Sequence, residues 1–179
     1  HFPTTHHDAL ALLFLRWYAH GFGYDPRIVH DEVDGGEWVT HNGEGRALQA
    51  LGTEHALVVH GEDGMDELSI SSPTTVWELR NGELRSYTTT PEDAGLTQAS
   101  LDDIRGGTAE ENALTARNTL SGTTGPTTDV VLLNAAAALL VGGKAADLKQ
   151  GVTLAQQAIE SGAATDKLET FASLSQQLS

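Results

Sequence analysis

The clearest hydrophobic pattern lies in the last third of the chain, where apolar residues recur at helical spacing. Residues 129–143 are apolar on almost every side and end in two glycines, which predicts a buried core helix with a glycine cap. Residues 146–160 and 166–178 each have one apolar and one polar face, as amphipathic helices do. Upstream, Thr108 and Glu111 have the spacing of a capping box at the start of another helix. This region is therefore predicted to be helical.

The middle of the chain has the patterns of β-strands. Residues 55–61, "HALVVHG", form a continuous apolar run that is typical of a buried strand in a parallel sheet, and residues 46–51 before it have a helical pattern. Residues 74–90 contain two β-prone runs separated by Asn81-Gly82, a dipeptide that suits a type I′ hairpin turn. The order predicts an α/β fold with a partial central sheet, a β-hairpin and C-terminal helices.

The N-terminal segment differs in composition, since all eight histidines lie between His1 and His60. Residues 8–20 predict a short, mostly buried helix, and residues 37–41 a short strand. Imidazole and carboxylate groups ligate transition metals, but no two histidines have the i, i+4 spacing of a helical metal site. We therefore do not expect a metal site in this group, and we interpret the adjacent His6 and His7 as a solvated terminus. The composition divides the chain into an atypical His-rich segment, 1–45, and a second part, 46–179, which we interpret as the C-terminal part of an α/β domain. The group comprises His6, His7, Asp8, His20, His30, Asp31 and His41.

The charge and the missing cysteines exclude several functions. Asp and Glu total 25 against 10 Lys and Arg, and the net charge of −15 repels nucleic acids and anionic lipid surfaces. No apolar run is long enough to span a membrane. Without cysteine there are no disulfides, thiolate metal sites or cysteine nucleophiles, which fits a reducing compartment. We expect a soluble, cytoplasmic protein that binds neither nucleic acid nor membranes.

Two glycine-containing stretches invite comparison with phosphate-binding loops. Gly142-Gly143-Lys144 lacks the upstream glycine and the Ser or Thr of such a loop, so it is interpreted as a helix cap. Arg105-Gly106-Gly107 is equally compatible with an anion-binding turn and with a simple connection to the next helix.

Residues 58–69, "VVHGEDGMDELS", lead from an apolar run into four carboxylates and two glycines. Loops that leave the carboxyl ends of strands commonly form the ligand crevice of α/β proteins. The adjacent Asp66 and Glu67 point in different directions from one backbone stretch, and Mg²⁺ prefers one or two protein carboxylates together with water and phosphate oxygens. The spacing leaves two interpretations open, a magnesium site and a solvated acidic loop.

From about residue 46 onward, the chain resembles the C-terminal part of the anthranilate phosphoribosyltransferases. The resemblance rests on "ALVVHGEDGMDELS", "PTTVWEL", "GELRSYTTTPEDAGL", "RGGTAEENA" and "VLLNAAAAL", which occur in the family's order. This family joins the amino nitrogen of anthranilate to ribose C1 of phosphoribosyl pyrophosphate in tryptophan biosynthesis, and releases pyrophosphate in the presence of magnesium. The resemblance implies a nucleoside phosphorylase/phosphoribosyltransferase-like fold, those two substrates and Mg²⁺ as the cofactor.

The resemblance also implies that Asp66 and Glu67 hold a magnesium ion on the pyrophosphate, and it is compatible with a homodimer. No catalytic residue is assigned, and His60, Glu62 and Asp63 receive no catalytic role. The family's "GTGGD" loop and "KHGNR" segment are absent from the 179 residues, so we expect the chain alone to be incomplete as an enzyme. Whether it is a fragment, a rearranged product or an engineered sequence is left open.

Two alternatives to the enzyme remain. The chain is a non-catalytic scaffold that keeps part of the fold without its chemistry, or it belongs to the related nucleoside phosphorylases, which share the architecture and use phosphate as the nucleophile. The hairpin and the "PEDAGL" stretch favour the anthranilate enzyme over the phosphorylases.

Overall fold

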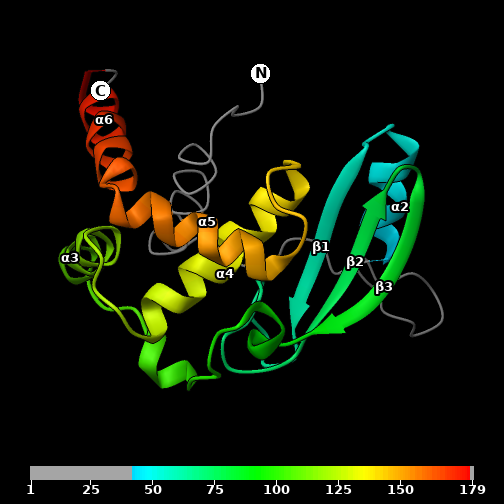
Figure 1. Cartoon of the computed structure of the whole chain (residues 1–179), viewed down its shortest axis with the longest axis horizontal. Coiled ribbons are helices and arrows are strands. Elements are labelled where there is room, and N and C mark those ends of the chain that lie inside the picture. The colour runs from blue at the N-terminus through cyan, green and yellow to red at the C-terminus, as the bar shows by residue number, and fades with distance from the viewer. Residues whose placement is uncertain (1–41, 178–179) are drawn as a thin grey trace.

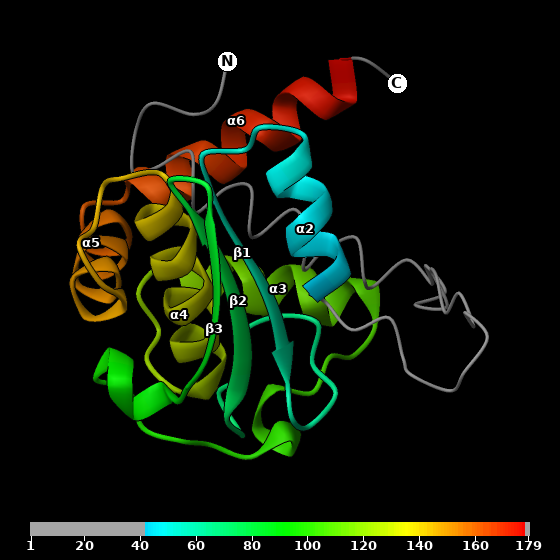
Figure 2. The same ribbon diagram turned by 90° about the vertical axis from the view of Figure 1, so that its right-hand side faces the viewer.

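A computed structural model describes residues 42–177, which form a three-stranded sheet with one helix on one face and a group of helices on the other (Figures 1 and 2). The expected helix at residues 8–20, the expected strand at 37–41 and the entire histidine group lie outside the described residues. The division at residue 45 stays a prediction. The elements are α2 (Asn42–Ala50), β1 (His55–Gly61), β2 (Thr74–Arg80), β3 (Glu83–Thr89), the 3-10 helices η1 (Pro91–Ala94) and η2 (Leu101–Ile104), α3 (Ala109–Leu120), α4 (Pro126–Val141), α5 (Leu148–Glu160) and α6 (Ala163–Gln177).

The sheet has the order β1-β2-β3, and both described pairings are antiparallel. The expectation of a parallel-type strand at β1 is therefore wrong for its pairing with β2. Its continuous apolar run has another cause, because α4 contacts β1 on one face of the sheet and α2 contacts it on the other (Figure 2). On the α4 side, Leu57 and Val59 pack against the main hydrophobic core. A strand covered on both faces is apolar at successive positions whatever its direction.

The predicted hairpin is confirmed. Asn81 has φ 53° and Gly82 has φ 82°, so both turn positions have the positive φ of a type I′ turn. This turn sets a register in which Arg80 lies opposite Glu83 and Trp77 lies opposite Ser86. In the pairing of β1 with β2, Gly61 lies opposite Thr74, so the carboxyl end of β1 and the start of β2 lie together, joined by the loop 62–73.

The predicted helices are present, with small differences at their ends. The capping box before α3 is confirmed, because Thr108 N donates to Glu111 Oε2 (2.8 Å) and Glu111 N donates to the Thr108 hydroxyl (3.3 Å). Helix α4 begins three residues earlier than its apolar run, at Pro126, because proline is favoured in the first turn, where its missing N–H costs nothing. Gly143, with φ 66°, follows the end of α4, which confirms the helix-cap interpretation of the glycine pair.

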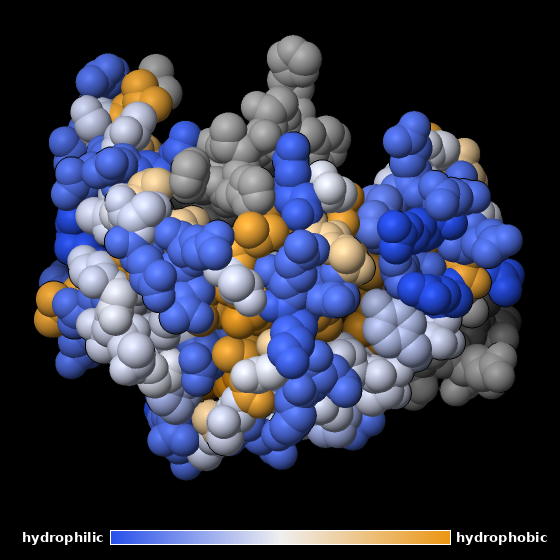
Figure 3. Space-filling view, viewed as in Figure 1, coloured by the Kyte–Doolittle hydropathy of each residue, from blue (hydrophilic) through white to orange (hydrophobic). Residues whose placement is uncertain are grey.

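The core lies between the sheet and helices α4 and α5. Its central residues come from the loop after β1, from β2 and from α4: Leu68, Ile70, Val76, Leu132, Leu133, Ala135, Ala136 and Leu139. In Figure 3 apolar residues are visible in the middle of the face where α4 and α5 lie, with hydrophilic residues around them. Among residues 42–177, no helix combines the length and apolar character needed to cross a membrane.

Candidate functional site

The predicted acidic pair lies in the loop 62–73, between β1 and β2. Asp66 is exposed, and Glu67 is half-buried. The next residue, Leu68, is only 1% exposed, and Ile70 is fully buried in the core. The two carboxylates therefore occupy the point where the chain turns from the surface into the core. Such a position gives a charged group access to solvent while its backbone is held by packing.

The backbone is held by hydrogen bonds on both sides of the pair. On the N-terminal side, Met65 N donates to Asp63 Oδ1 (3.1 Å), and Met65 O accepts from Gly61 N (2.9 Å). On the C-terminal side, Leu68 N donates to Asn134 Oδ1 (2.9 Å), and Leu68 O accepts from Asn134 Nδ2 (2.9 Å). Only Asp66 and Glu67 stand between these two fixed residues.

Asp63, which sequence reasoning passed over, organises the N-terminal half of the loop. Its carboxylate accepts hydrogen bonds from the hydroxyls of Ser69 (2.5 Å) and Ser71 and from Met65 N. Burial by itself would raise the pKa of Asp63, but these hydrogen bonds outweigh it and hold the pKa below its ordinary value of 3.8. The neighbouring Glu62, by contrast, is exposed to solvent. Nothing in the spacing of the two acids distinguishes them.

The anion-binding alternative for residues 105–107 is not favoured by the structure. Gly107 N donates to Asn112 Oδ1 (2.8 Å), and Asn112 Nδ2 returns a hydrogen bond to Gly107 O (3.1 Å). Arg105 pairs with Asp102 at 2.7 Å. Because this amide and this guanidinium already have partners within the same turn, the segment is described best as the connection into α3.

A second polar cluster lies on the α4 side of the sheet, around Glu78. The residue is 1% exposed, and its carboxylate pairs with Arg85 (2.6 Å) and with His55 Nε2 (3.1 Å) from the two flanking strands. Burial would raise the pKa of Glu78, but the hydrogen bonds and charges of Arg85 and His55 outweigh it and hold the pKa below 4.5. The cluster joins all three strands and is structural in character.

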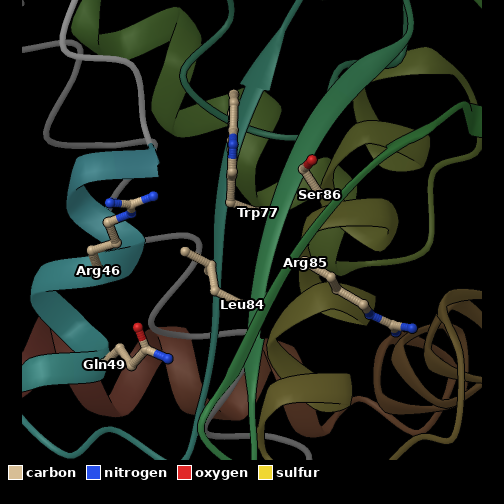
Figure 4. A pocket seen from close by; sticks show the side chains of 6 residues that line it. All are labelled: Arg46, Gln49, Trp77, Leu84, Arg85 and Ser86. Atoms are coloured by element: carbon tan, nitrogen blue, oxygen red, sulfur yellow. The ribbon is translucent and has the colours of Figure 1, made fainter.

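A pocket of about 550 Å³ lies on the other side of the sheet from α4, between α2 and the face of the sheet that α2 covers (Figure 4). In Figure 4, Arg46 and Gln49 project from α2, whereas Arg85 points away from that helix. The pocket is lined by Arg46, Gln49, Trp77, Leu84, Arg85 and Ser86. None of these residues belongs to the loop 62–73, so the pocket and the acidic pair are separate features.

The donors available in the loop suit a hard cation. Across residues 42–177, no group of three or more His, Asp or Glu side chains is gathered in a way that could hold a metal ion. Asp66 and Glu67 offer two carboxylates, one exposed and one half-buried. Magnesium is commonly held by one or two carboxylates, with water and phosphate oxygens completing its coordination, so this donor set fits Mg²⁺.

Comparison with known proteins supports the resemblance. Residues 41–165 match the family described as "Glycosyl transferase family, a/b domain". The anthranilate phosphoribosyltransferase of Rhodopseudomonas palustris (strain HaA2) is 53% identical over 130 residues, which are 73% of this chain and 38% of that protein. That of Symbiobacterium thermophilum is 56% identical over 124 residues, 69% of this chain and 36% of that protein. The chain thus spans well under half the length of these relatives.

Solved structures agree with these sequence comparisons. The anthranilate phosphoribosyltransferase of Thermus thermophilus superposes with a TM-score of 0.65 at 42% identity, covering 72% of this chain and 38% of that one. The Saccharomyces cerevisiae enzyme in complex with PRPP and Mg superposes with a TM-score of 0.60 at 29% identity, covering 65% and 34%. The predicted resemblance and the predicted α/β fold class are confirmed.

Proposed function

The chain belongs to the glycosyl transferase family, a/b domain, and from its identity of 53% and 56% to two anthranilate phosphoribosyltransferases we propose that it is the C-terminal part of the α/β domain of such an enzyme. The intact protein would transfer the phosphoribosyl group from phosphoribosyl pyrophosphate to anthranilate in tryptophan biosynthesis. The observation that carries this proposal is the identity of 53% over 130 residues and of 56% over 124 residues to these enzymes. The family match runs from residue 41 to residue 165 and so includes the acidic loop together with helix α4, which holds that loop.

Within that reaction, we assign to Asp66 and Glu67 the binding of magnesium on the pyrophosphate. When bound, the ion would offset the negative charge that develops on the leaving pyrophosphate as its bond to ribose C1 breaks. The residues of this chain supply two carboxylates on a backbone that is held at Met65 and at Leu68. Holding these groups in place before the substrate arrives lowers the entropic cost of binding. No described residue is assigned as a general base.

The substrates, the assembly and the location belong to the same proposal. Phosphoribosyl pyrophosphate and anthranilate are proposed because the Saccharomyces cerevisiae enzyme was solved in complex with PRPP and Mg and, separately, with 4-fluoroanthranilate. A homodimer and a cytoplasmic location are proposed from the family resemblance and from the absence of cysteine.

The test uses a chimera of the Thermus thermophilus enzyme in which residues 42–177 of this chain replace the aligned segment. Asp66→Asn combined with Glu67→Gln keeps the side-chain shapes and removes two charges. We expect turnover to fall at least about tenfold and the magnesium requirement to rise, with little change in melting temperature.

The matched control is Glu54→Gln combined with Glu62→Gln, which removes two exposed charges near the two ends of β1. A comparable loss in the control would indicate a diffuse effect of charge. A normal rate and a normal magnesium titration in the Asp66/Glu67 variant would exclude the metal assignment. An inactive chimera without these substitutions would favour the non-catalytic scaffold.

A further inference from the structure

Asn134 is an unusual residue for its position. It lies in α4, between the buried Leu133 and Ala135, and is itself only 7% exposed. Asparagine is a poor residue for a helix interior, and a buried amide is costly unless its hydrogen bonds are made. Its amide bonds three backbone groups, because Oδ1 accepts from Leu68 N and the two hydrogens of Nδ2 are donated to Leu68 O and Val130 O. The side chain therefore compensates its burial by holding other parts of the chain.

The most distant of these contacts is at the acidic loop. By accepting from Leu68 N and donating to Leu68 O, the Asn134 amide pairs with that residue as a neighbouring strand would, across a sequence separation of 66 residues. The peptide bond that follows Glu67 is consequently fixed against α4. Since Met65 is also held, by Asp63 and Gly61, the backbone from which the two carboxylates project is held on both sides.

We propose that Asn134 is a positioning residue for the metal-binding pair, and that it connects the packing of α4 to the placement of Asp66 and Glu67. This inference rests on the proposed function, because it assigns to Asn134 the orientation of the same two carboxylates. A purely structural role would reduce stability without a selective effect on the loop. If Asn134 has a positioning role, its substitution lowers the order of the loop and its metal affinity by more than the loss of overall stability explains.

The experiment uses the 179-residue chain, labelled with ¹⁵N, with Mn²⁺ alone as the probe. Asn134→Leu removes all three hydrogen bonds and keeps the number and branching of the side-chain heavy atoms. Asn134→Asp keeps the acceptor for Leu68 N but places an oxygen against Leu68 O and Val130 O, and it carries the test if the leucine variant does not fold. Thr165→Val is the matched control, because it removes another long-range bond from a side chain to a backbone carbonyl, Thr165 Oγ1 to Leu120 O (2.8 Å).

Two measurements are made on each folded variant. Amide hydrogen exchange reports the hold on Leu68 without any metal, and paramagnetic broadening at Asp66 and Glu67 during a Mn²⁺ titration reports affinity. In the Asn134 variant we expect Leu68 exchange to accelerate and the Mn²⁺ dissociation constant to rise, each at least about tenfold, as for residues that orient metal ligands. In Thr165→Val both should stay at the wild-type values.

The outcomes separate the two proposals. Wild-type exchange at Leu68, or wild-type Mn²⁺ affinity, in a folded Asn134 variant would overturn the positioning role alone. If the wild-type chain shows no Mn²⁺-dependent broadening at Asp66 and Glu67, the metal assignment of the proposed function fails and the positioning role fails with it.

Discussion

The contact between α4 and α5 offers a prediction whose sign differs from what sequence alone suggests. Gly151 lies in α5, and glycine in a helix interior is usually less stable than alanine by about 1 kcal/mol. The structure indicates the opposite effect for Gly151→Ala. A Cβ placed at Gly151 would lie 2.7 Å from both Cα and Cβ of Ala136 and 2.9 Å from its carbonyl oxygen. Real Cβ atoms do not approach their neighbours so closely, so the two helices would have to separate.

The size of the loss in stability depends on the atoms that the new methyl group would contact. Ala136 is fully buried, and two of the three close atoms belong to the backbone of α4, which no side-chain rotation can move away. Overpacking of this kind costs about 1–3 kcal/mol. After subtraction of the gain in helix propensity, we expect Gly151→Ala to lower the free energy of unfolding by up to about 2 kcal/mol and the melting temperature by up to about 8 °C. The displaced helix is the one that carries Asn134.

Thermal unfolding followed by circular dichroism measures the effect, and Gly45→Ala is the matched control. Gly45 also lies in a helix, α2, but a Cβ there would meet the end of the Leu84 side chain, at 2.8 Å from Cδ1, which can rotate away. We expect Gly45→Ala to be neutral or to raise stability by up to about 1 kcal/mol. If Gly151→Ala raised the melting temperature as Gly45→Ala does, the inferred close contact of α4 and α5 would be wrong.

Three further predictions concern the sheet and the ligand. Gly82→Val should destabilise the turn by about 1–2 kcal/mol, because Asn81 and Gly82 both have positive φ, and an unchanged melting temperature would contradict the turn. The pKa of Glu78 lies below 4.5 in the folded protein, so the pairing of its carboxylate with Arg85 and His55 stabilises the fold above pH 4.5 and is lost as the pH falls through the lowered pKa. In urea unfolding, the Glu78→Gln variant should be less stable than the wild type at pH 7, and its free energy of unfolding should change less between pH 7 and pH 3. An equal pH dependence in the two proteins would contradict the role of this pairing. The 179-residue chain should bind phosphoribosyl pyrophosphate weakly or not at all, because it lacks "GTGGD", and micromolar binding in calorimetry would refute this.

Much of the fold could be predicted because the relevant signals are local. The type I′ turn depends on two adjacent residues, Asn81 and Gly82, and the α3 cap depends on Thr108 and Glu111, three positions apart. The direction of β1 could not be predicted in this way. A continuous apolar run reports that both faces are covered, and here α2 and α4 cover them in an antiparallel arrangement.

The candidate site was found in part. Asp66 and Glu67 stand out in the sequence as adjacent acids after an apolar run, and the family motif includes them. Their role as metal ligands stays a prediction. Asp63 did not stand out from Glu62, since the difference between them is the set of hydroxyls that fold back onto Asp63 from Ser69 and Ser71.

By itself, the sequence determined the helices, the hairpin and the family, because each depends on residue types at short spacing or on motifs in order. Only the tertiary structure decided which distant groups meet. Asn134 accepts a hydrogen bond from Leu68 N, and Ala136 packs closely against Gly151, which has no Cβ. Such contacts depend on how helices pack against the sheet and against one another, and an asparagine or a glycine within a helical pattern does not specify its partner. The physical reason is that local hydrogen bonding and backbone preference act over a few residues, whereas burial brings together groups that the chain itself keeps far apart.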